Sequence, residues 1–250
     1  MPGIRLSNTE KKAQKWWEKE NSANFLSGIS IECPASLGLR GITSLELNFK
    51  SPVSVISGKN GSGKSTLLAL SVLGFHGNGK DSPRQAKNGT HYTFNDFFFK
   101  GPSDPTIKDV KIKWSYKGSA NNLEIEKKSS KWMHYERRPK NHSEYIGISR
   151  CVPAFEQSVL RQHFSSSSTE TKAKPLDKKW RDRLSTITGM SYKSAEEKTS
   201  KKYKIRECST AQSYSSFNMG AGEDIAFEIL SIIFSAPEHS IIAIEELGKL

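Results

Sequence analysis

The strongest constraint in this 250-residue sequence is the stretch at residues 53–72. An apolar, β-branched run at 53–56 predicts a buried parallel strand. The next residues, Gly-Lys-Asn-Gly-Ser-Gly-Lys-Ser at 58–65, fit the pattern G-x-x-x-x-G-K-[ST] at every position. Residues 66–72 are rich in Leu and Ala, which favour a helix. Strand, glycine-rich loop and helix in this order predict a site that binds the phosphates of a nucleoside triphosphate.

The residue types in this loop have chemical reasons. Gly58, Gly61 and Gly63 allow the backbone to curl, so that successive N–H groups point at one anion. The positive end of the helix that begins near Lys64 adds to this attraction. The Lys64 ammonium can reach the β- and γ-phosphates, and the Ser65 hydroxyl can hold Mg²⁺. A glycine-rich turn that merely contains lysine is the alternative, and the flanking strand and helix argue against it. The candidate nucleotide-binding residues are Gly58, Asn60, Gly61, Ser62, Gly63, Lys64, Ser65 and Thr66.

The charge of the chain favours a polyanionic partner. Its formal net charge is +12 and its pI is about 9.5, a balance typical of proteins that bind nucleic acid, although excess charge can also serve solubility alone. Residues 161–206 carry 13 Lys and Arg against five Asp and Glu. Within them, 178–183 and 201–204 interleave aromatic residues with cations, a pattern shared by single-strand binders and ordinary solvated helices. We therefore expect nucleic acid or an effector protein as the partner.

Cysteine usage and hydropathy bear on the cellular compartment. The three cysteines are far apart and form no C-x-x-C pair, so neither a disulfide framework nor a zinc site is expected. No apolar stretch approaches the roughly 18 residues of a membrane span. The first residues lack the apolar core of a secretion signal. We expect a cytoplasmic protein without a membrane partner.

Hydrophobic periodicity predicts several short elements. Residues 7–10, Ser-Asn-Thr-Glu, have the pattern of a capping box, so we expect a helix over 7–20. It either docks on its own domain, the favoured interpretation, or serves as a partner-binding arm. Alternation of apolar and polar residues predicts half-buried strands at 29–32 and 45–49 and a β-hairpin over 110–127.

The end of the sequence offers a second set of candidate residues. A turn of small residues at 216–223 precedes an apolar helix at 224–234 and an apolar strand at 240–244. The strand ends in Glu245 and Glu246. One carboxylate there can bind Mg²⁺ and the other can polarise an attacking water, as a phosphate-loop enzyme requires. A solvated glutamate pair that merely ends a strand is the alternative.

The order and spacing of these motifs resemble ABC-type ATPases. The acidic pair begins 181 residues after Lys64, much further than in small GTPases, nucleotide kinases or AAA+ motors. The loop at 58–66 and the lack of any transporter feature are similar to the SMC-type and OLD-type branch. That branch includes DNA-repair ATPases and ATPases of bacterial antiphage defence. The resemblance covers residues 28–72 and 214–247.

The resemblance implies an α/β P-loop NTPase fold with an ABC-like mixed sheet. A helical arm at 1–27 would precede a single ATPase domain at 28–250. Within that domain we expect a phosphate-binding core at 28–90, an inserted antiparallel β lobe at 90–148, a helical and basic insert at 150–212 that includes a polar loop at 165–174, and the signature and acidic strand at 213–250.

The resemblance also implies ATP and Mg²⁺ as cofactors and a role for each matching residue. Lys64 and Ser65 are the phosphate and Mg²⁺ ligands. Glu245 stands where the family has a metal-linked aspartate, and Glu246 matches the catalytic glutamate. Arg40 is similar to a cation that helps hold phosphate in SMC-type heads.

Residues 219–223 match the signature turn, which in this family reaches across a dimer to the γ-phosphate bound by the partner. Gly220 stands where the family has a serine, so contact with that phosphate would fall to backbone N–H groups or to Ser216. The middle glutamine of the family has no clear match, and Asp96 or Gln85 are candidates. The signature residues are Gly220, Ala221, Gly222 and Glu223.

These features predict an ATPase subunit that dimerises, or forms a higher oligomer, around ATP·Mg²⁺ and is coupled to nucleic acid or a nuclease effector, with antiphage defence as the implied role. The alternatives are an ATP-gated scaffold with little hydrolysis and a transporter nucleotide-binding domain, which the basic insert disfavours. Family elements that follow the acidic strand have no counterpart before residue 250. We therefore expect either a fragment of a longer ATPase or a second chain that supplies them.

Overall fold

The computed structural model of the chain describes residues 6–20, 24–33, 38–77, 91–118, 122–128, 132–134, 137–165 and 170–245. Contacts divide the chain into two compact units. The first contains residues 1–145 and 237–243, and the second contains 146–236 and 244–250. Each is mixed α/β and has its own sheet. None of the helices in the described ranges is long and apolar enough to cross a membrane.

An antiparallel sheet with strand order β2-β1-β3-β4 forms one side of the first unit. Its side chains alternate between buried and exposed, as the sequence predicts; in β3, Ile112 and Trp114 are fully buried. The hairpin of β3 and β4 pairs with β1 and so extends the sheet that contains β2, rather than forming a separate lobe. The strands are β1 (Phe25–Glu32), β2 (Ser44–Asn48), β3 (Val110–Lys117) and β4 (Leu123–Lys127).

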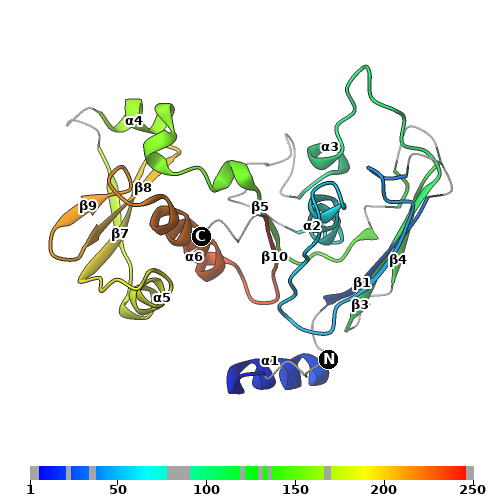
Figure 1. Cartoon of the computed structure of the whole chain (residues 1–250), viewed down its shortest axis with the longest axis horizontal. Coiled ribbons are helices and arrows are strands. Elements are labelled where there is room, and N and C mark those ends of the chain that lie inside the picture. Colours follow the sequence, from blue (N-terminus) through cyan, green and yellow to red (C-terminus); the bar gives the residue numbers. More distant parts are fainter. Residues whose placement is uncertain are drawn as a thin grey trace. The chain divides into compact units, whose positions relative to one another are not determined.

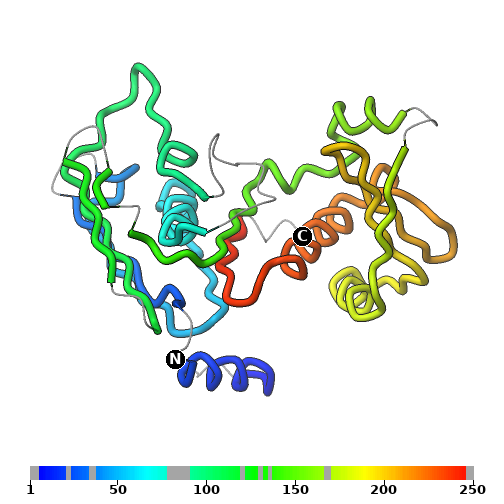
Figure 2. Tube along the Cα trace, turned by 180° about the vertical axis from the view of Figure 1, so that it is seen from behind, coloured from blue at the N-terminus to red at the C-terminus, as the bar shows by residue number. Residues whose placement is uncertain are grey.

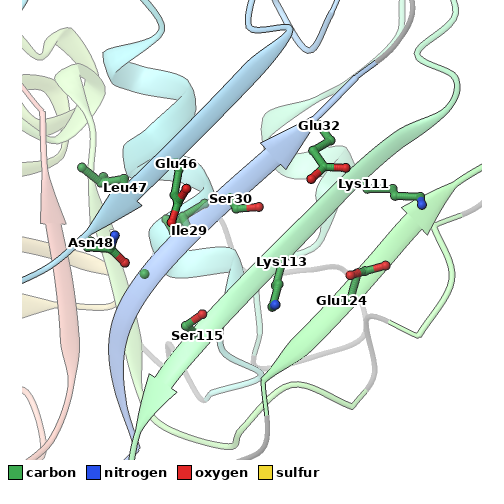
Figure 3. Close-up of a pocket in the computed structure, with 11 residues that line it drawn as sticks. Ile29, Ser30, Glu32, Glu46, Leu47, Asn48, Lys111, Lys113, Ser115 and Glu124 are labelled. Atoms are coloured by element: carbon green, nitrogen blue, oxygen red, sulfur yellow. The ribbon is translucent and has the colours of Figure 1, made fainter.

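The two faces of this sheet have different roles. One face packs on α2 (Lys64–Leu73) and builds the core of the unit (Figure 1). The other face is mostly polar and carries a shallow hollow of about 330 Å³ that residues of all four strands line, among them Gly28 and Ser30 of β1 (Figure 3). The charged side chains around this hollow are Glu32, Glu46, Lys111, Lys113 and Glu124.

A two-stranded sheet of β5 (Ser143–Ile146) and β10 (Ile241–Ile244) joins segments far apart in the sequence (Figure 2). The Ile241 N–H donates to the His142 carbonyl at 3.0 Å, and the Glu245 N–H donates to the Ile146 carbonyl at 2.9 Å. Because both bonds advance in the same direction along the two strands, the pair is parallel. The predicted strand at 240–244 is therefore confirmed at Ile241–Ile244.

The prediction of a buried parallel strand at 53–56 is wrong. The segment has no strand conformation, and Val53 and Val55 are 78% and 88% exposed. Only Ile56 packs against the core. The reason is that an extended segment becomes a sheet strand only when a neighbouring backbone takes its hydrogen bonds, and none of the strands in the described ranges pairs with this one.

The second unit packs helices on an antiparallel sheet of order β6-β7-β8-β9. Its core joins α5 to α6 through the contact of Trp180 with Phe227, whose ring centroids are 4.3 Å apart. The polar loop predicted at 165–174 is wrong at its end, because β6 begins at Lys172 and pairs with β7. Its elements are η2 (Ile148–Arg150), η3 (Ala154–Glu156), α4 (Ser158–Phe164), β6 (Lys172–Pro175), α5 (Lys178–Thr188), β7 (Ser194–Ser200), β8 (Tyr203–Ser209), β9 (Ser213–Ser215) and α6 (Ala221–Ser235).

The predicted N-terminal helix is confirmed as α1 (Asn8–Lys19). Ser7 and Glu10 form the reciprocal bonds of the capping box. Trp17 is buried against Phe25 of β1, with ring centroids 5.4 Å apart. Of the two interpretations of this helix, docking on its own domain is thus the one observed.

Three buried side chains donate hydrogen bonds to backbone carbonyl groups at the C-terminal end of α2, where several carbonyl groups lack a partner within the helix. The Trp114 indole donates to the Leu70 carbonyl at 2.9 Å, and the Tyr116 hydroxyl donates to the Gly74 carbonyl at 2.5 Å. Burial raises the pKa of Tyr116, so its hydroxyl stays protonated as a donor.

Arg138 is the third anchor of α2. Its guanidinium donates to the Leu73 carbonyl at 2.8 Å and to the Tyr92 carbonyl at 3.3 Å. A cation at this end of a helix also interacts favourably with the helix dipole. The side chain therefore ties α2 to the segment that leads into α3 (Phe94–Phe97).

We expect Arg138→Ala to lower the free energy of unfolding by about 2–4 kcal/mol, because two buried carbonyl groups lose their donor. Urea denaturation should show a lower midpoint with an unchanged slope. Arg137→Ala is the matched control, because Arg137 is exposed and its loss should change the midpoint little. Equal midpoints for the two variants would contradict the anchoring role.

Candidate nucleotide-binding site

The loop at 58–63 has the backbone shape that its glycines allow. Gly61 and Gly63 have φ angles of 81° and 91°, in the left-handed region that side chains disfavour. A Cβ atom on Gly63 would lie 2.6 Å from the Cδ1 atom of Ile42. Gly63 is therefore favoured by its conformation, and a side chain there would also force the Ile42 side chain to move. Turns of this kind can direct backbone N–H groups at one anion.

Lys64 begins α2 immediately after the loop. Its ammonium donates to the Gly58 carbonyl at 2.8 Å and to the Lys59 carbonyl at 2.9 Å, so its charge is held beside the loop backbone. Ser65 is exposed at the start of the helix, whereas Thr66 is buried. The ammonium and the Ser65 hydroxyl are thus placed at the N-terminal end of a buried helix, a position that favours anions.

The turn at 38–43 brings Arg40 to the same part of the unit. Ile42 of this turn lies against Gly63, and an isolated bridge between Leu39 and Ile42 closes the turn. The Arg40 guanidinium donates to the Phe97 carbonyl at 2.5 Å and lies 4.9 Å from the centre of the Phe98 ring. The structure therefore places this turn next to the phosphate loop, while the side chain of Arg40 contacts the C-terminal end of α3.

Asp96, one candidate for the middle glutamine, caps α3. Its carboxylate accepts from the Thr93 N–H at 2.7 Å and from the Thr93 hydroxyl at 2.9 Å. This capping box explains the residue without any contact to a nucleotide. The other candidate, Gln85, lies outside the described residues.

One of the two predicted acidic residues lies at the end of β10. Glu245 directly follows the strand and is half-buried. Glu246 lies outside the described residues. Glu245 and the signature turn belong to the second unit, whereas the phosphate loop and Arg40 belong to the first.

The signature residues form the beginning of α6. Gly220 is the N-cap residue, and Gly220 and Ala221 are exposed. The carboxylate of Glu223 accepts from the Tyr192 hydroxyl at 2.8 Å and from the Tyr214 hydroxyl at 2.7 Å. Burial, together with this carboxylate, raises the pKa of both tyrosines. The side chain of Glu223 therefore stabilises its own unit, and the exposed N–H groups at the start of α6 are the part that can face a ligand.

A buried ion cluster beside α6 was not found by sequence reasoning. Arg206 is 9% exposed and pairs with Asp224 at 3.4 Å and with Glu228. Arg150 reaches Glu228 at 3.1 Å, and the Ala154 N–H donates to Asp224 at 2.7 Å. Burial lowers the pKa of Arg206, and Asp224 opposes that effect. The acidic first turn of α6 is visible in the sequence, but its partners are distant and leave no local signal.

Comparison with known proteins supports the motif analysis. A family model described as an AAA domain matches residues 37–239, which is most of the chain and includes the phosphate loop, Arg40 and the signature turn. Searches of curated proteins and of solved structures find no significant match.

We expect Gly63→Ala to weaken binding of a fluorescent ATP analogue at least about tenfold, because the new Cβ would strain the backbone and displace Ile42. Equilibrium titration monitored by fluorescence anisotropy measures the effect. Gly189→Ala is the matched control: Gly189 also has a positive φ, 72°, at a helix end, but it lies on α5 with open space around it. Similar losses in both variants would mean that general strain, and not the shape of the loop, is responsible.

Proposed function

The chain belongs to the AAA-domain family, and from this premise we propose that it binds ATP with Mg²⁺ and hydrolyses it. Membership of this family itself suggests ATPase activity. The observation that carries the proposal is the phosphate loop with its left-handed glycines, followed by Lys64 at the start of a buried helix.

In the proposed mechanism, different residues bind the phosphates, bind the metal ion and activate the attacking water. The loop N–H groups and Lys64 would hold the β- and γ-phosphates, and the Ser65 hydroxyl would hold the metal ion. The family resemblance alone assigns Glu245 as a further metal ligand. When bound, Mg²⁺ neutralises charge on the phosphate oxygens. Glu246 orients a water molecule and accepts its proton while the water oxygen bonds to the γ-phosphorus and the bond to ADP breaks.

The proposed assembly is an SMC-like dimer around ATP, with the ABC-type arrangement that the motif order implies. The start of α6 supports it, because Gly220 and Ala221 are exposed at the N-terminus of a 15-residue helix. Such an end attracts an anion, and in a dimer that anion would be the γ-phosphate on the other copy. A role in antiphage defence rests on the family resemblance alone.

Nucleic acid is the proposed partner of the second unit. Lys198, Lys204 and Arg206 are used in ion pairs within the unit. By contrast, Lys178, Lys179 and Arg183 are exposed along α5 and line a shallow surface hollow with Asp182 and Thr186. Cations on such a surface can contact the phosphates of a nucleic acid.

ATP turnover by the chain and by Lys64→Ala tests the enzymatic proposal. We expect the variant to lose roughly 100-fold or more of the activity, since it lacks the charge that stabilises the transferred phosphoryl group. Release of inorganic phosphate, with and without DNA, is the measurement. Turnover that Lys64→Ala leaves unchanged would sink the proposal.

Glu246→Gln separates an ATPase from an ATP-gated scaffold. In an ATPase this variant should still bind ATP but lose turnover, and sedimentation in the presence of ATP should show the trapped dimer. In a scaffold, turnover is already negligible and the substitution changes little. If Glu246→Gln binds ATP but sediments as a monomer, the proposed dimer is contradicted and the proposed ATP site is not.

We expect Lys178→Gln/Lys179→Gln/Arg183→Gln to weaken DNA binding and to reduce its dependence on salt, because fewer counterions are released. Lys198→Gln is the control, because Lys198 pairs with Glu207 at 2.7 Å within the unit. Affinity measured across a series of salt concentrations provides the slope. A slope equal to that of the unmodified chain would exclude α5 from the contact.

A further inference from the structure

The N-terminal helix α1 contacts its own unit through Trp17. Trp17 is buried against Phe25, and the ammonium of Lys117 both donates to the Trp17 carbonyl and lies 5.4 Å from the centre of the Trp17 ring. The capping box of Ser7 and Glu10 fixes the start of the helix. The contacts of Trp17 therefore leave most of the helix surface exposed.

The neighbouring face of α1 combines one exposed aromatic ring with three cations. Trp16 is 44% exposed, although its ring makes an edge contact with Phe25 at 5.4 Å. Lys12, Lys15 and Lys19 lie three or four residues apart along the helix and therefore share the face of Trp16. Together with Glu20 these four residues line a shallow hollow of about 300 Å³.

We propose that this face of α1 binds single-stranded nucleic acid, with a base stacked on Trp16 and phosphates on the three lysines. The proposal deepens the proposed function, from which it takes only the class of partner, and adds a separate surface in the first unit. Lys12 and Lys19 are about 10 Å apart along the helix axis, so the lysines can follow a strand over successive phosphates.

The Trp16 ring favours single-stranded nucleic acid over other polyanions as the ligand of this face. A base in a single strand exposes its flat face, and aromatic–base stacking is the main sequence-independent contact of single-strand binders. A duplex keeps its base faces inside the helix, and an acidic peptide has no flat ring to place on an indole. An anionic membrane requires a wide apolar face for insertion, whereas Trp16 is the only apolar residue among those that line this hollow.

The test uses the full chain and a 5′-fluorescein-labelled 15-mer of deoxythymidine. Anisotropy reports binding, and quenching of tryptophan fluorescence by an unlabelled 15-mer reports stacking. The sequence has five tryptophans, so the quenching must be assigned by substitution. Trp16→Leu keeps an apolar contact for Phe25 and removes the indole, while Trp16→Phe keeps an aromatic ring.

We expect Trp16→Leu to weaken binding about tenfold and to abolish the quenching, and Trp16→Phe to retain most of the affinity. Lys12→Gln/Lys15→Gln/Lys19→Gln should weaken binding at least about tenfold and lower the salt slope by about 2, the value for three single-strand phosphate contacts. Lys50→Gln/Lys111→Gln/Lys113→Gln removes the same charge from exposed positions of the same unit and should bind like the unmodified chain. Thermal unfolding followed by circular dichroism checks that each variant is folded.

Three results would overturn the proposal: quenching that persists in Trp16→Leu, unchanged affinity in the α1 lysine variant, or an oligoglutamate peptide that binds with the same dependence on Trp16. The proposed function fails separately. Loss of DNA binding on substitution of the α5 cations, with α1 variants unaffected, would reject this inference and leave the partner of the proposed function in place. Binding of the 15-mer that depends on Trp16, in a chain without ATP turnover, would support the inference and reject the ATPase.

Discussion

The first unit depends on the hydrogen bonds that hold the C-terminal end of α2. A helix end leaves several carbonyl groups without partners, and here Tyr116 and Arg138 donate to two of them from outside the helix. Trp114 adds a second bond to the Leu70 carbonyl, which also accepts from the Gly74 N–H. The helix is almost entirely buried, so these carbonyl groups have little access to water as an alternative partner. Because a ten-residue helix is a rigid body about 15 Å long, contacts at this end also set the position of the phosphate loop at the other.

Contacts at both ends of α2 lead to the region of α3. Arg138 connects the helix end to the Tyr92 carbonyl, which leads into α3. The last residue of α3, Phe97, accepts from Arg40, and the turn that carries Arg40 places Ile42 against Gly63 of the loop. Arg138 thus connects one end of α2 to the segment before α3, and the turn of Arg40 lies between α3 and the loop at the other end. One arginine is buried and structural, whereas the other is exposed beside the site.

The start of α6 in the second unit is organised by charge. Two tyrosine hydroxyls donate to Glu223, and Arg206 pairs with Asp224 and Glu228 of the same helix. Buried charges are costly unless they are paired and hydrogen-bonded, so this cluster fixes the direction of the helix and leaves Gly220 at its exposed tip. The side chains near the signature turn make contacts within their own unit, so the backbone N–H groups are the part of the turn that could bind a ligand.

The sequence by itself determined the features that depend on neighbours along the chain. The loop at 58–65 follows from glycines that must adopt left-handed angles, the start of α1 from a capping box, and the hairpin over 110–127 from strict alternation. The nucleotide-binding candidates from Gly58 to Thr66 were for this reason the most predictable part of the site. Their pattern is local and needs no knowledge of the fold.

Only the tertiary structure decided which segments find partners. The apolar run at 53–56 has the composition of a buried strand but lies exposed, because a strand requires a neighbouring backbone and composition does not supply one. Likewise, Arg138 bonds the end of α2, and Arg206 pairs with carboxylates of α6. Nothing in the sequence distinguishes these two residues from the many other cations of a basic chain. Their roles depend on contacts 65 and 18 residues away along the chain, respectively, and such contacts exist only after the chain has folded.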